Sequence, residues 1–531
     1  MIDIKIPEIQ LHQRGMGAGG KQKSLQDLGR NIYVAVGVNT KFRKFQRTYV
    51  DDRIAYVYDC LPALRKTFAP YQEEVLGYFD SGERRVAVRG PHGLGKTLLA
   101  AIIVHHTLLT TEEDSKVPTL ASVGRQLERY LWPEIHKIAG LIDWHQVGRD
   151  PYSRDELMTL SIRLRHEAGL SEAFAVSAGS AADIEGAHAS RLFYVFDEAK
   201  TIEKEMWNAA EGAFSTEGAV LIGSDKLGEC YWFAISTPGP PTGEYYNIHS
   251  HKEGYENWRV RHVTLDEAIK AGMVGAEWVE LCRKKWGEHS AVYQNRVLGE
   301  FATDQTTSTI PLSWIEAAFD RYGDWVDSGK LGEGLGLRIL GVDTARYGDD
   351  TSVVAERVGD RLEKMIQYPD VSVPVMAGYV KNHGMTAAEV RIEMDSGLGA
   401  GVYDIIESER TSWENRLINL IPVYMGAGIS SMDSTNTFRF NCVRSAAYWH
   451  MRELLDPDGP YKVVLCPDDE LLGDLSAPRY EIKYMFGHLT IAVEPKENIK
   501  KQDRLGRSPD KGDAVVLAYW DGNAGGGGVV I

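Results

Sequence analysis

The chain has few cysteines and no long apolar run, and each absence removes a class of protein. Its five cysteines, at 60, 230, 282, 442 and 466, are far apart in 531 residues and form no C-x-x-C pair. A disulfide framework and a cysteine-based zinc site are therefore not expected, and a reducing cytosol fits this usage. No apolar run approaches the length that spans a membrane, and the N-terminus has no signal-peptide core. We expect neither a membrane segment nor secretion.

Positive charge is also in deficit. Lysine and arginine number 59 against 75 aspartate and glutamate, which gives a formal net charge of −16. This balance argues against a protein that coats nucleic acid indiscriminately, but it allows a local basic channel. The apolar content of 43% and charged content of 25% are ordinary for a globular protein. No internal repeat is visible, and a chain this long predicts roughly two to four domains.

A glycine-rich loop between a strand and a helix is the most informative feature present. Residues 85–97 are RVAVRGPHGLGKT, which contains the P-loop pattern G-x-x-x-x-G-K-T. The apolar run before the loop predicts a buried strand, and residues 98–109 predict a helix; an ordinary glycine turn would not explain both flanks. In such a loop, backbone N–H groups close around phosphates, the lysine reaches the β- and γ-phosphates, and the threonine helps to hold Mg²⁺. The expected contacts to ATP are Gly90, Gly93, Gly95, Lys96 and Thr97.

An apolar strand that ends in two acids follows downstream. Residues 192–199 are LFYVFDEA, so Asp197 and Glu198 stand at the end of the run. Asp197 is predicted to support Mg²⁺, and Glu198 is predicted to act as the general base that polarises the attacking water. A strand that ends in a solvated acidic turn is the alternative. The P-loop upstream favours the catalytic interpretation.

Five further residues are candidates for the ATPase site. Ser236 and Thr237 end another apolar strand and suit sensing of the γ-phosphate; the alternative is a strand cap. Gln72 has the donor and acceptor that an adenine edge needs, unless it only begins a helix at the surface. Arg125 is the first choice for stabilising transition-state charge and Arg89 the second, with a solvated surface arginine as the alternative for either.

Acids also end apolar segments in the second half of the chain. Residues 338–343 and 390–395 are strand-like and end in Asp343 and Asp395, and the first is followed by a predicted hairpin through residues 347–350. The segment SPDKGDA contains Asp510 and Asp513 and opens an apolar helix. Three acids at one sheet edge can hold two divalent cations, and oxygen ligands favour Mg²⁺ or Mn²⁺. A turn or helix cap is the alternative for each acid, and the choice between Asp510 and Asp513 stays open.

These patterns divide the chain. We expect an arm and helical lead-in over 1–60, and an α/β P-loop ATPase domain with a mostly parallel sheet and a linker over 61–303. A second α/β domain is expected over 304–522 and a flexible tail over 523–531.

Joined in this order, the segments resemble the large terminase subunit of tailed bacteriophages, over roughly residues 60 to 520. That family combines an N-terminal P-loop ATPase with a C-terminal nuclease of the ribonuclease-H-like fold, and it packages DNA. The segments that carry the resemblance are IEGAH at 184–188, the acids at 197–198, STPG at 236–239, VLGEF at 297–301, GVD at 341–343 and SPDKGDA at 508–514.

The resemblance implies roles by position. Lys96, Thr97, Asp197 and Glu198 would form the ATPase site, and Ser236 and Thr237 would couple hydrolysis to movement. The nuclease ligands would be Asp343, Asp395 and Asp513, with Asp510 as the rival for the third place. Many terminases carry an early arginine within the P-loop, whereas Arg89 lies just outside it here, so Arg125 is preferred. Implied partners are double-stranded DNA, a portal protein and a small terminase subunit, with a homo-oligomeric ring docked transiently on the procapsid in the host cytoplasm.

Two other classes fit part of the pattern. A helicase or repair translocase with a fused nuclease would need further helicase motifs after residue 237, and no arginine-rich signature is visible there. An ATPase whose second domain only docks would predict that the carboxylates do not cluster. In the nuclease interpretation, we expect a local basic set to neutralise DNA phosphates, with a solvated basic loop as the alternative. Its members are Lys496, Lys500, Lys501, Arg504, Arg507 and Lys511.

Overall fold

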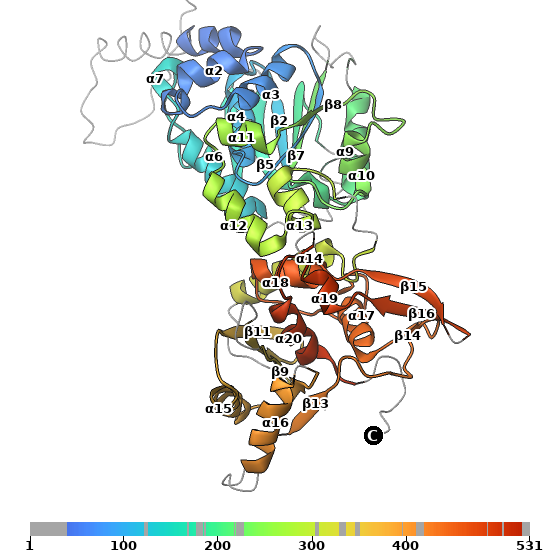
Figure 1. Cartoon of the computed structure of the whole chain (residues 1–531). Coiled ribbons are helices and arrows are strands. Elements are labelled where there is room, and N and C mark those ends of the chain that lie inside the picture. The colour runs from blue at the N-terminus through green and yellow to red at the C-terminus, as the bar shows by residue number, and fades with distance from the viewer. Residues whose placement is uncertain are drawn as a thin grey trace, which may run out of the picture.

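The computed structural model describes residues 40–121, 126–166, 169–176, 184, 187–216, 218, 228–302, 307–328, 336–345, 351–395, 397–409, 419–485, 487–501 and 504–522. The N-terminal arm to residue 39, Arg125, the hairpin turn at 347–350 and the tail from 523 lie outside these residues. Figure 1 shows one sheet with its helices in the first half of the chain and further sheets with helices in the second half. The two α/β units predicted from the sequence are confirmed, and their limits stay predictions.

The first sheet has eight strands in the order β3-β4-β5-β2-β6-β7-β1-β8. Strands β5, β2, β6, β7, β1 and β8 are parallel, and only β3 and β4 run against their neighbours. Every residue of β6 is buried, which is typical of a strand covered on both faces. The bounds are β1 Arg85–Arg89, β2 Ser115–Leu120, β3 Leu157–Met158, β4 Ser161–His166, β5 Gly169–Val176, β6 Arg191–Asp197, β7 Glu229–Ser236 and β8 Arg259–His262.

Helix α4 is the central helix of this half. It begins at Lys96, directly after the glycine-rich loop, and all its residues from Leu99 to Thr110 are buried. His105 lies within it and contacts the Ile135 carbonyl at 2.8 Å, and burial lowers the pKa of its imidazole to about 4. The helices are α2 Arg53–Cys60, α3 Pro70–Asp80, α4 Lys96–Thr110, α6 Trp132–Ala139, α7 Trp144–Val147, α9 Lys204–Ala213, α10 Gly243–His249, α11 Leu265–Lys270, α12 Ala276–Trp286 and α13 Ala291–Tyr293.

The second half is built on a five-stranded mixed sheet in the order β11-β10-β9-β12-β13. Strand β10 runs antiparallel to both β9 and β11, whereas β9, β12 and β13 are parallel. An antiparallel hairpin that continues into parallel strands is the ribonuclease-H-like arrangement expected from the sequence. The bounds are β9 Arg338–Asp343, β10 Ser352–Val358, β11 Arg361–Tyr368, β12 Glu389–Glu393 and β13 Leu420–Val423, with a smaller sheet of β14 Arg439–Phe440, β15 Tyr480–Met485 and β16 His488–Val493.

Helix α20 packs directly on β9. A Cβ added at Gly341 of β9 would lie 2.1 Å from the Ala514 carbonyl of α20, so only glycine permits this approach. The remaining helices are α14 Leu312–Asp327, α15 Val373–Gly384, α16 Leu398–Glu409, α17 Val443–Leu455, α18 Asp469–Ser476, α19 Lys496–Ile499 and α20 Asp510–Tyr519. Among the helices described, none is both long and apolar enough to cross a membrane.

Candidate functional site

The glycine-rich loop has the backbone that a phosphate cradle requires. Gly93 and Gly95 have φ angles of 86° and 68°, which favour glycine. A Cβ at Gly90 would lie 2.7 Å from the Val263 carbonyl, so this position has no room for a side chain. Lys96 follows at the first position of α4 and donates to the Pro91 carbonyl at 3.2 Å, within the loop. Burial lowers the pKa of Lys96, and Glu198 and Asp197 oppose that shift. Thr97 is the next residue of the helix.

The two predicted acids of the ATPase site stand at the end of β6. Asp197 is buried and accepts a hydrogen bond from the Glu198 backbone N–H at 3.0 Å. Burial and the neighbouring Glu198 raise the pKa of Asp197 to about 7, and Lys96 opposes them. Glu198 has a φ of 47°, in the left-handed region that non-glycine residues seldom adopt, and such strain clusters at functional sites.

Ser236 orients the Glu198 carboxylate. At the end of β7, its buried hydroxyl donates to Glu198 Oε2 at 2.9 Å. The adjacent Thr237 is also buried, and its hydroxyl oxygen accepts from Lys200 Nζ at 3.4 Å. Lys200 also pairs with Glu316 of α14 at 3.7 Å. The structure therefore brings the predicted hydroxyls to the predicted base, and connects them to a helix of the second half.

Gln72 lies beside the loop, but its amide is bonded to backbone at both ends. Its side chain is buried, its Nε2 donates to the Leu94 carbonyl at 3.0 Å, and its Oε1 accepts from the Ala69 N–H at 2.9 Å. These bonds begin α3 and brace the P-loop. The geometry favours the helix-start alternative, in a buried rather than a surface position.

Of the two arginine candidates, the structure describes one. Arg89 donates to the Gly299 carbonyl at 2.8 Å and forms an ion pair with Glu300 at 2.5 Å. Both partners belong to the VLGEF segment at the junction of the halves. Arg89 is thus engaged in a contact within the chain, and the role of Arg125 stays a prediction outside the described residues.

Three buried aspartates of the second half surround one ammonium group. Lys496 Nζ lies 3.0 Å from Asp343 Oδ2, 3.2 Å from Asp510 Oδ1 and 3.0 Å from Asp513 Oδ2. Asp343 ends β9, whereas Asp510 and Asp513 stand in the first turn of α20. The predicted clustering of these acids is present, and the rivals Asp510 and Asp513 both take part. Sequence reasoning placed Lys496 on a DNA-binding surface and missed it as the central counter-charge.

Asp513 is held by α17. Its Oδ1 accepts hydrogen bonds from Arg444 at 2.7 Å and from the Tyr448 hydroxyl at 2.6 Å, which leaves Oδ2 facing Lys496. Burial opposes its ionisation, but Arg444 and Lys496 together hold the pKa of Asp513 below its usual value. Arg444 and Tyr448 carried no signal in the sequence, because their spacing from Asp513 is set only by packing.

The structure brings Glu393, rather than Asp395, next to Asp343. Asp395 is exposed and accepts from the Gly426 N–H at 2.7 Å. Burial raises the pKa of Asp343, Lys496 opposes this shift, and the neighbouring Glu393 carboxylate adds to it. The register explains the difference: β12 pairs Ile392 with Val342 of β9, so the next residues on the two strands are Glu393 and Asp343. The segment RIEMD contains both acids, so the pairing register was the missing signal.

The donor set fits a hard divalent cation. Asp343 Oδ1 is buried and has no hydrogen-bond partner among the described residues, and further carboxylate oxygens point at a single positive charge. Oxygen ligands of this kind suit Mg²⁺ or Mn²⁺. No group of three or more acids, histidines or cysteines in the described ranges is already arranged around a metal position. Lys496 occupies the centre instead, and would have to move before a cation could bind there.

Four of the six members of the predicted basic DNA-binding set form ion pairs within the chain, and DNA binding by the set stays a prediction. Lys496 is enclosed by the three aspartates. The other three form ion pairs within the chain: Arg504 with Glu494 at 2.6 Å, Arg507 with Asp474 at 2.6 Å and Lys511 with Asp468 at 2.7 Å. Paired charges of this kind do not form an open basic surface, because their fields are largely cancelled locally.

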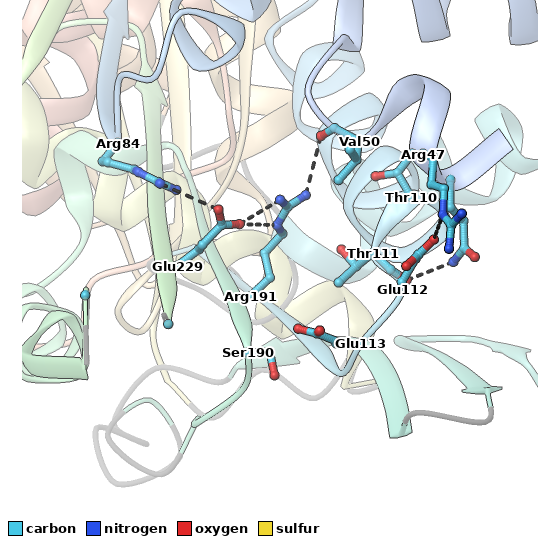
Figure 2. A pocket seen from close by; sticks show the side chains of 13 residues that line it. Arg47, Val50, Arg84, Thr110, Thr111, Glu112, Glu113, Ser190, Arg191 and Glu229 are labelled. Carbon is cyan, nitrogen blue, oxygen red and sulfur yellow. Dashed lines mark hydrogen bonds and ion pairs between the residues drawn. The ribbon is translucent and has the colours of Figure 1, made fainter. Parts of the chain in front are cut away.

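A cavity of about 730 Å³ lies at the amino ends of strands β6 and β7 of the first sheet (Figure 2). Arg191 and Glu229, which line it, stand at the start of β6 and β7, whereas the P-loop and acids stand at the carboxyl ends of the strands. These two residues pair with each other at 2.6 Å. Ligands of open parallel sheets bind at the carboxyl edge, so we do not assign the nucleotide to this cavity.

No protein-family profile matches the sequence, and no curated protein matches it. Among solved structures, the chain is similar to the large terminase from a thermophilic bacteriophage, with 12% identity over 85% of this chain and 98% of that one, at a TM-score of 0.37. The same protein in complex with ATP-gamma-S gives 12% identity, the same coverage and a TM-score of 0.36. The nuclease domain of the large terminase subunit of bacterial virus Sf6, with manganese and beta-thujaplicinol, gives 16% identity over 40% of this chain and 98% of that one, at a TM-score of 0.32. At these values the function has to be inferred from the chain's own residues.

Proposed function

We propose that this chain is an ATP hydrolase joined to a metal-dependent DNA endonuclease, and that it acts as the large terminase subunit of a tailed bacteriophage. The observation that carries the proposal is the trio of buried aspartates around Lys496, in the same chain as a P-loop with an oriented glutamate. Separate sites at the edges of two sheets match the two activities that packaging requires: movement of DNA and cutting of DNA.

In the first half, each residue has a distinct task. The loop N–H groups and Lys96 bind the phosphates, and Thr97 and Asp197 would hold Mg²⁺. Glu198 takes the proton of the attacking water, and the hydrogen bond from Ser236 keeps its carboxylate aimed. Because Thr237 contacts Lys200, which pairs with Glu316, a change at the phosphates has a path of contacts towards the second half.

In the second half, Asp343, Asp510, Asp513 and Glu393 would hold Mg²⁺ or Mn²⁺. When bound, such cations supply positive charge at the scissile phosphate and a more acidic water. Arg444 and Tyr448 hold Asp513 in place, and before a cation binds Lys496 compensates part of the buried negative charge. The proposed substrate is double-stranded DNA. The proposed partners are a portal protein and a small terminase subunit, with the chain in a homo-oligomeric ring on the procapsid in the host cytoplasm.

The test uses the full-length chain with Mn²⁺, ATP and plasmid DNA. Asp343→Asn should abolish cleavage and leave ATP hydrolysis in place, whereas Lys96→Ala should abolish hydrolysis and leave metal-dependent cleavage. Loss of both activities in a folded Asp343→Asn protein would contradict the separation of the sites. Absence of cleavage by the native chain with any divalent cation would favour a docking domain. ATP-driven unwinding of a forked duplex would favour the helicase class.

A matched pair of variants tests the choice of ligand on β12. Glu393→Gln should reduce cleavage strongly, since Glu393 contacts Asp343. Asp395→Asn should reduce it far less, because Asp395 is exposed and bonded to Gly426. The reverse order would restore Asp395 as the ligand.

A further inference from the structure

Helix α18 contacts both halves of the chain. It packs against α12 and α13 of the first half and against α20, which carries Asp510 and Asp513. The indole Nε1 of Trp286, the last residue of α12, donates to the Asp469 carbonyl at the start of α18, at 2.8 Å. Arg296 adds an ion pair to the Asp469 side chain at 3.5 Å. Helix α12 of the first half is therefore hydrogen-bonded to α18, which packs against the helix that carries Asp510 and Asp513.

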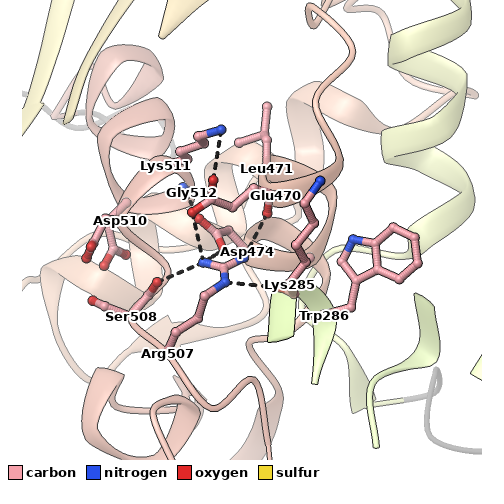
Figure 3. Close-up of polar contacts among 12 residues, drawn as sticks. Lys285, Trp286, Glu470, Leu471, Asp474, Arg507, Ser508, Asp510, Lys511 and Gly512 are labelled. Atoms are coloured by element: carbon pink, nitrogen blue, oxygen red, sulfur yellow. Dashed lines mark hydrogen bonds and ion pairs between the residues drawn. The ribbon is translucent and has the colours of Figure 1, made fainter. Parts of the chain in front are cut away.

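Arg507 joins α12 and α18 through one guanidinium group (Figure 3). Its Nε donates to the Lys285 carbonyl at the end of α12, at 3.0 Å, and its Nη2 donates to the Glu470 carbonyl of α18, at 3.2 Å. Its Nη1 pairs with Asp474 of α18 at 2.6 Å. The Lys285 carbonyl is one of the four at a helix C-terminus that have no partner within the helix. Only a planar fork of donors makes these contacts at once, so lysine is no substitute.

Asp474 connects Arg507 to the proposed nuclease site. Its side chain is fully buried, and its Oδ2 accepts from the Gly512 N–H at 3.1 Å. Gly512 lies between Asp510 and Asp513, and a Cβ there would come within 2.8 Å of the Asp474 Cβ. The first turn of α20 is thus packed and hydrogen-bonded onto Asp474, which is itself fixed by Arg507.

We infer that Arg507 and Asp474 are positioning residues, through which the docking of α12 sets the place of Asp510 and Asp513. The affinity of the nuclease site for its cation then depends on contact with the ATPase half. This inference rests on the proposed nuclease function. Loss of a partner that orients a metal ligand typically changes metal affinity by about 10- to 100-fold. A change in how α12 packs against α18 would accordingly change the cleavage rate by changing the affinity for the cation, not by changing contacts with DNA.

Two conservative variants of the full-length chain test the inference. Arg507→Lys keeps the charge but loses the fork, and Arg283→Lys, an exposed arginine of α12, is its control. Trp286→Phe keeps an aromatic ring, although a smaller one, but loses the N–H donor. Its control is Trp278→Phe on the same helix, for which the described part of the chain shows no hydrogen bond to the second half. The readouts are the Mn²⁺ concentration for half-maximal cleavage, the cleavage rate at saturating Mn²⁺, and ATP hydrolysis.

Arg507→Lys should raise the half-maximal Mn²⁺ concentration at least about tenfold. Trp286→Phe removes one hydrogen bond and should raise it about two- to tenfold. Cleavage should return towards the native rate at saturating Mn²⁺, and ATP hydrolysis and both controls should be unchanged. An unshifted Mn²⁺ midpoint in both variants would overturn the inference, as would a lower maximal rate with no shift.

A folding failure and a failure of the nuclease proposal can each be distinguished from a failure of this inference. If Arg507→Lys fails to fold, Trp286→Phe alone decides the matter. If the native chain cleaves no DNA, the nuclease proposal fails, and calorimetric titration of native and Trp286→Phe protein with Mn²⁺ still tests the positioning. Equal Mn²⁺ affinity, or no binding to either protein, would then overturn it.

Discussion

Replacing Lys496 by methionine should lower the stability of the metal-free protein and increase the rise in Tm that a divalent cation produces. Methionine keeps much of the aliphatic length but removes the ammonium group that lies 3.0–3.2 Å from three carboxylates. At an effective dielectric constant of about 20, each such pair contributes about 5 kcal/mol of attraction. Much of this is offset by desolvation, and the measured cost of removing one partner of a buried pair is about 3–5 kcal/mol.

The assay is thermal unfolding of the full-length chain in EDTA and in Mn²⁺. A loss of about 3 kcal/mol corresponds to a fall in Tm of about 6–12 °C for a domain of this size. Mn²⁺ should raise the Tm of Lys496→Met more than that of the native chain, because the cation no longer has to displace the ammonium group. Lys501→Met, at an exposed lysine of the same segment, is the control. An unchanged Tm in EDTA, or a smaller Mn²⁺ shift than in the native chain, would refute the reasoning.

Three other predictions concern the first half. Glu198→Gln should still bind ATP but hydrolyse it at least about 100-fold more slowly, measured by nucleotide binding and phosphate release. Normal turnover would remove Glu198 as the base. Gly299→Ala should raise the Kd for ATP, because its Cβ would lie 2.5 Å from the Gly90 Cα, whereas Gly272→Ala, with a similar φ and open space, should not. The pKa of His105 is lowered to about 4 by burial, so its contribution to stability is complete above pH 6.5 and is lost as pH falls towards 4. That loss is about 2 kcal/mol between pH 7 and pH 5, and denaturant unfolding of His105→Gln should show a correspondingly weaker pH dependence.

The sequence by itself determined the features that reside in one contiguous segment. The P-loop, the acids after β6 and the hydroxyls after β7 are set by local backbone and apolar patterning, and parallel strands place their ends at one edge. Their convergence, seen in the bond from Ser236 to Glu198, was therefore predictable. The same reasoning placed Asp343 and the first turn of α20 together at the second sheet.

The tertiary structure decided the contacts between distant segments. Glu393 rather than Asp395 neighbours Asp343 because of the register of β12 on β9, and a strand pattern does not reveal register. Lys496 is separated from Asp343 by 153 positions, and its place among the acids follows only from packing. Its place in a local set of basic residues marked it as part of a basic surface, yet burial beside three carboxylates made it their counter-charge. The sequence does not show whether a charged residue faces water or an ion pair. The electrostatic energy of its side chain differs between the two cases because only the fold sets its solvation and its partners.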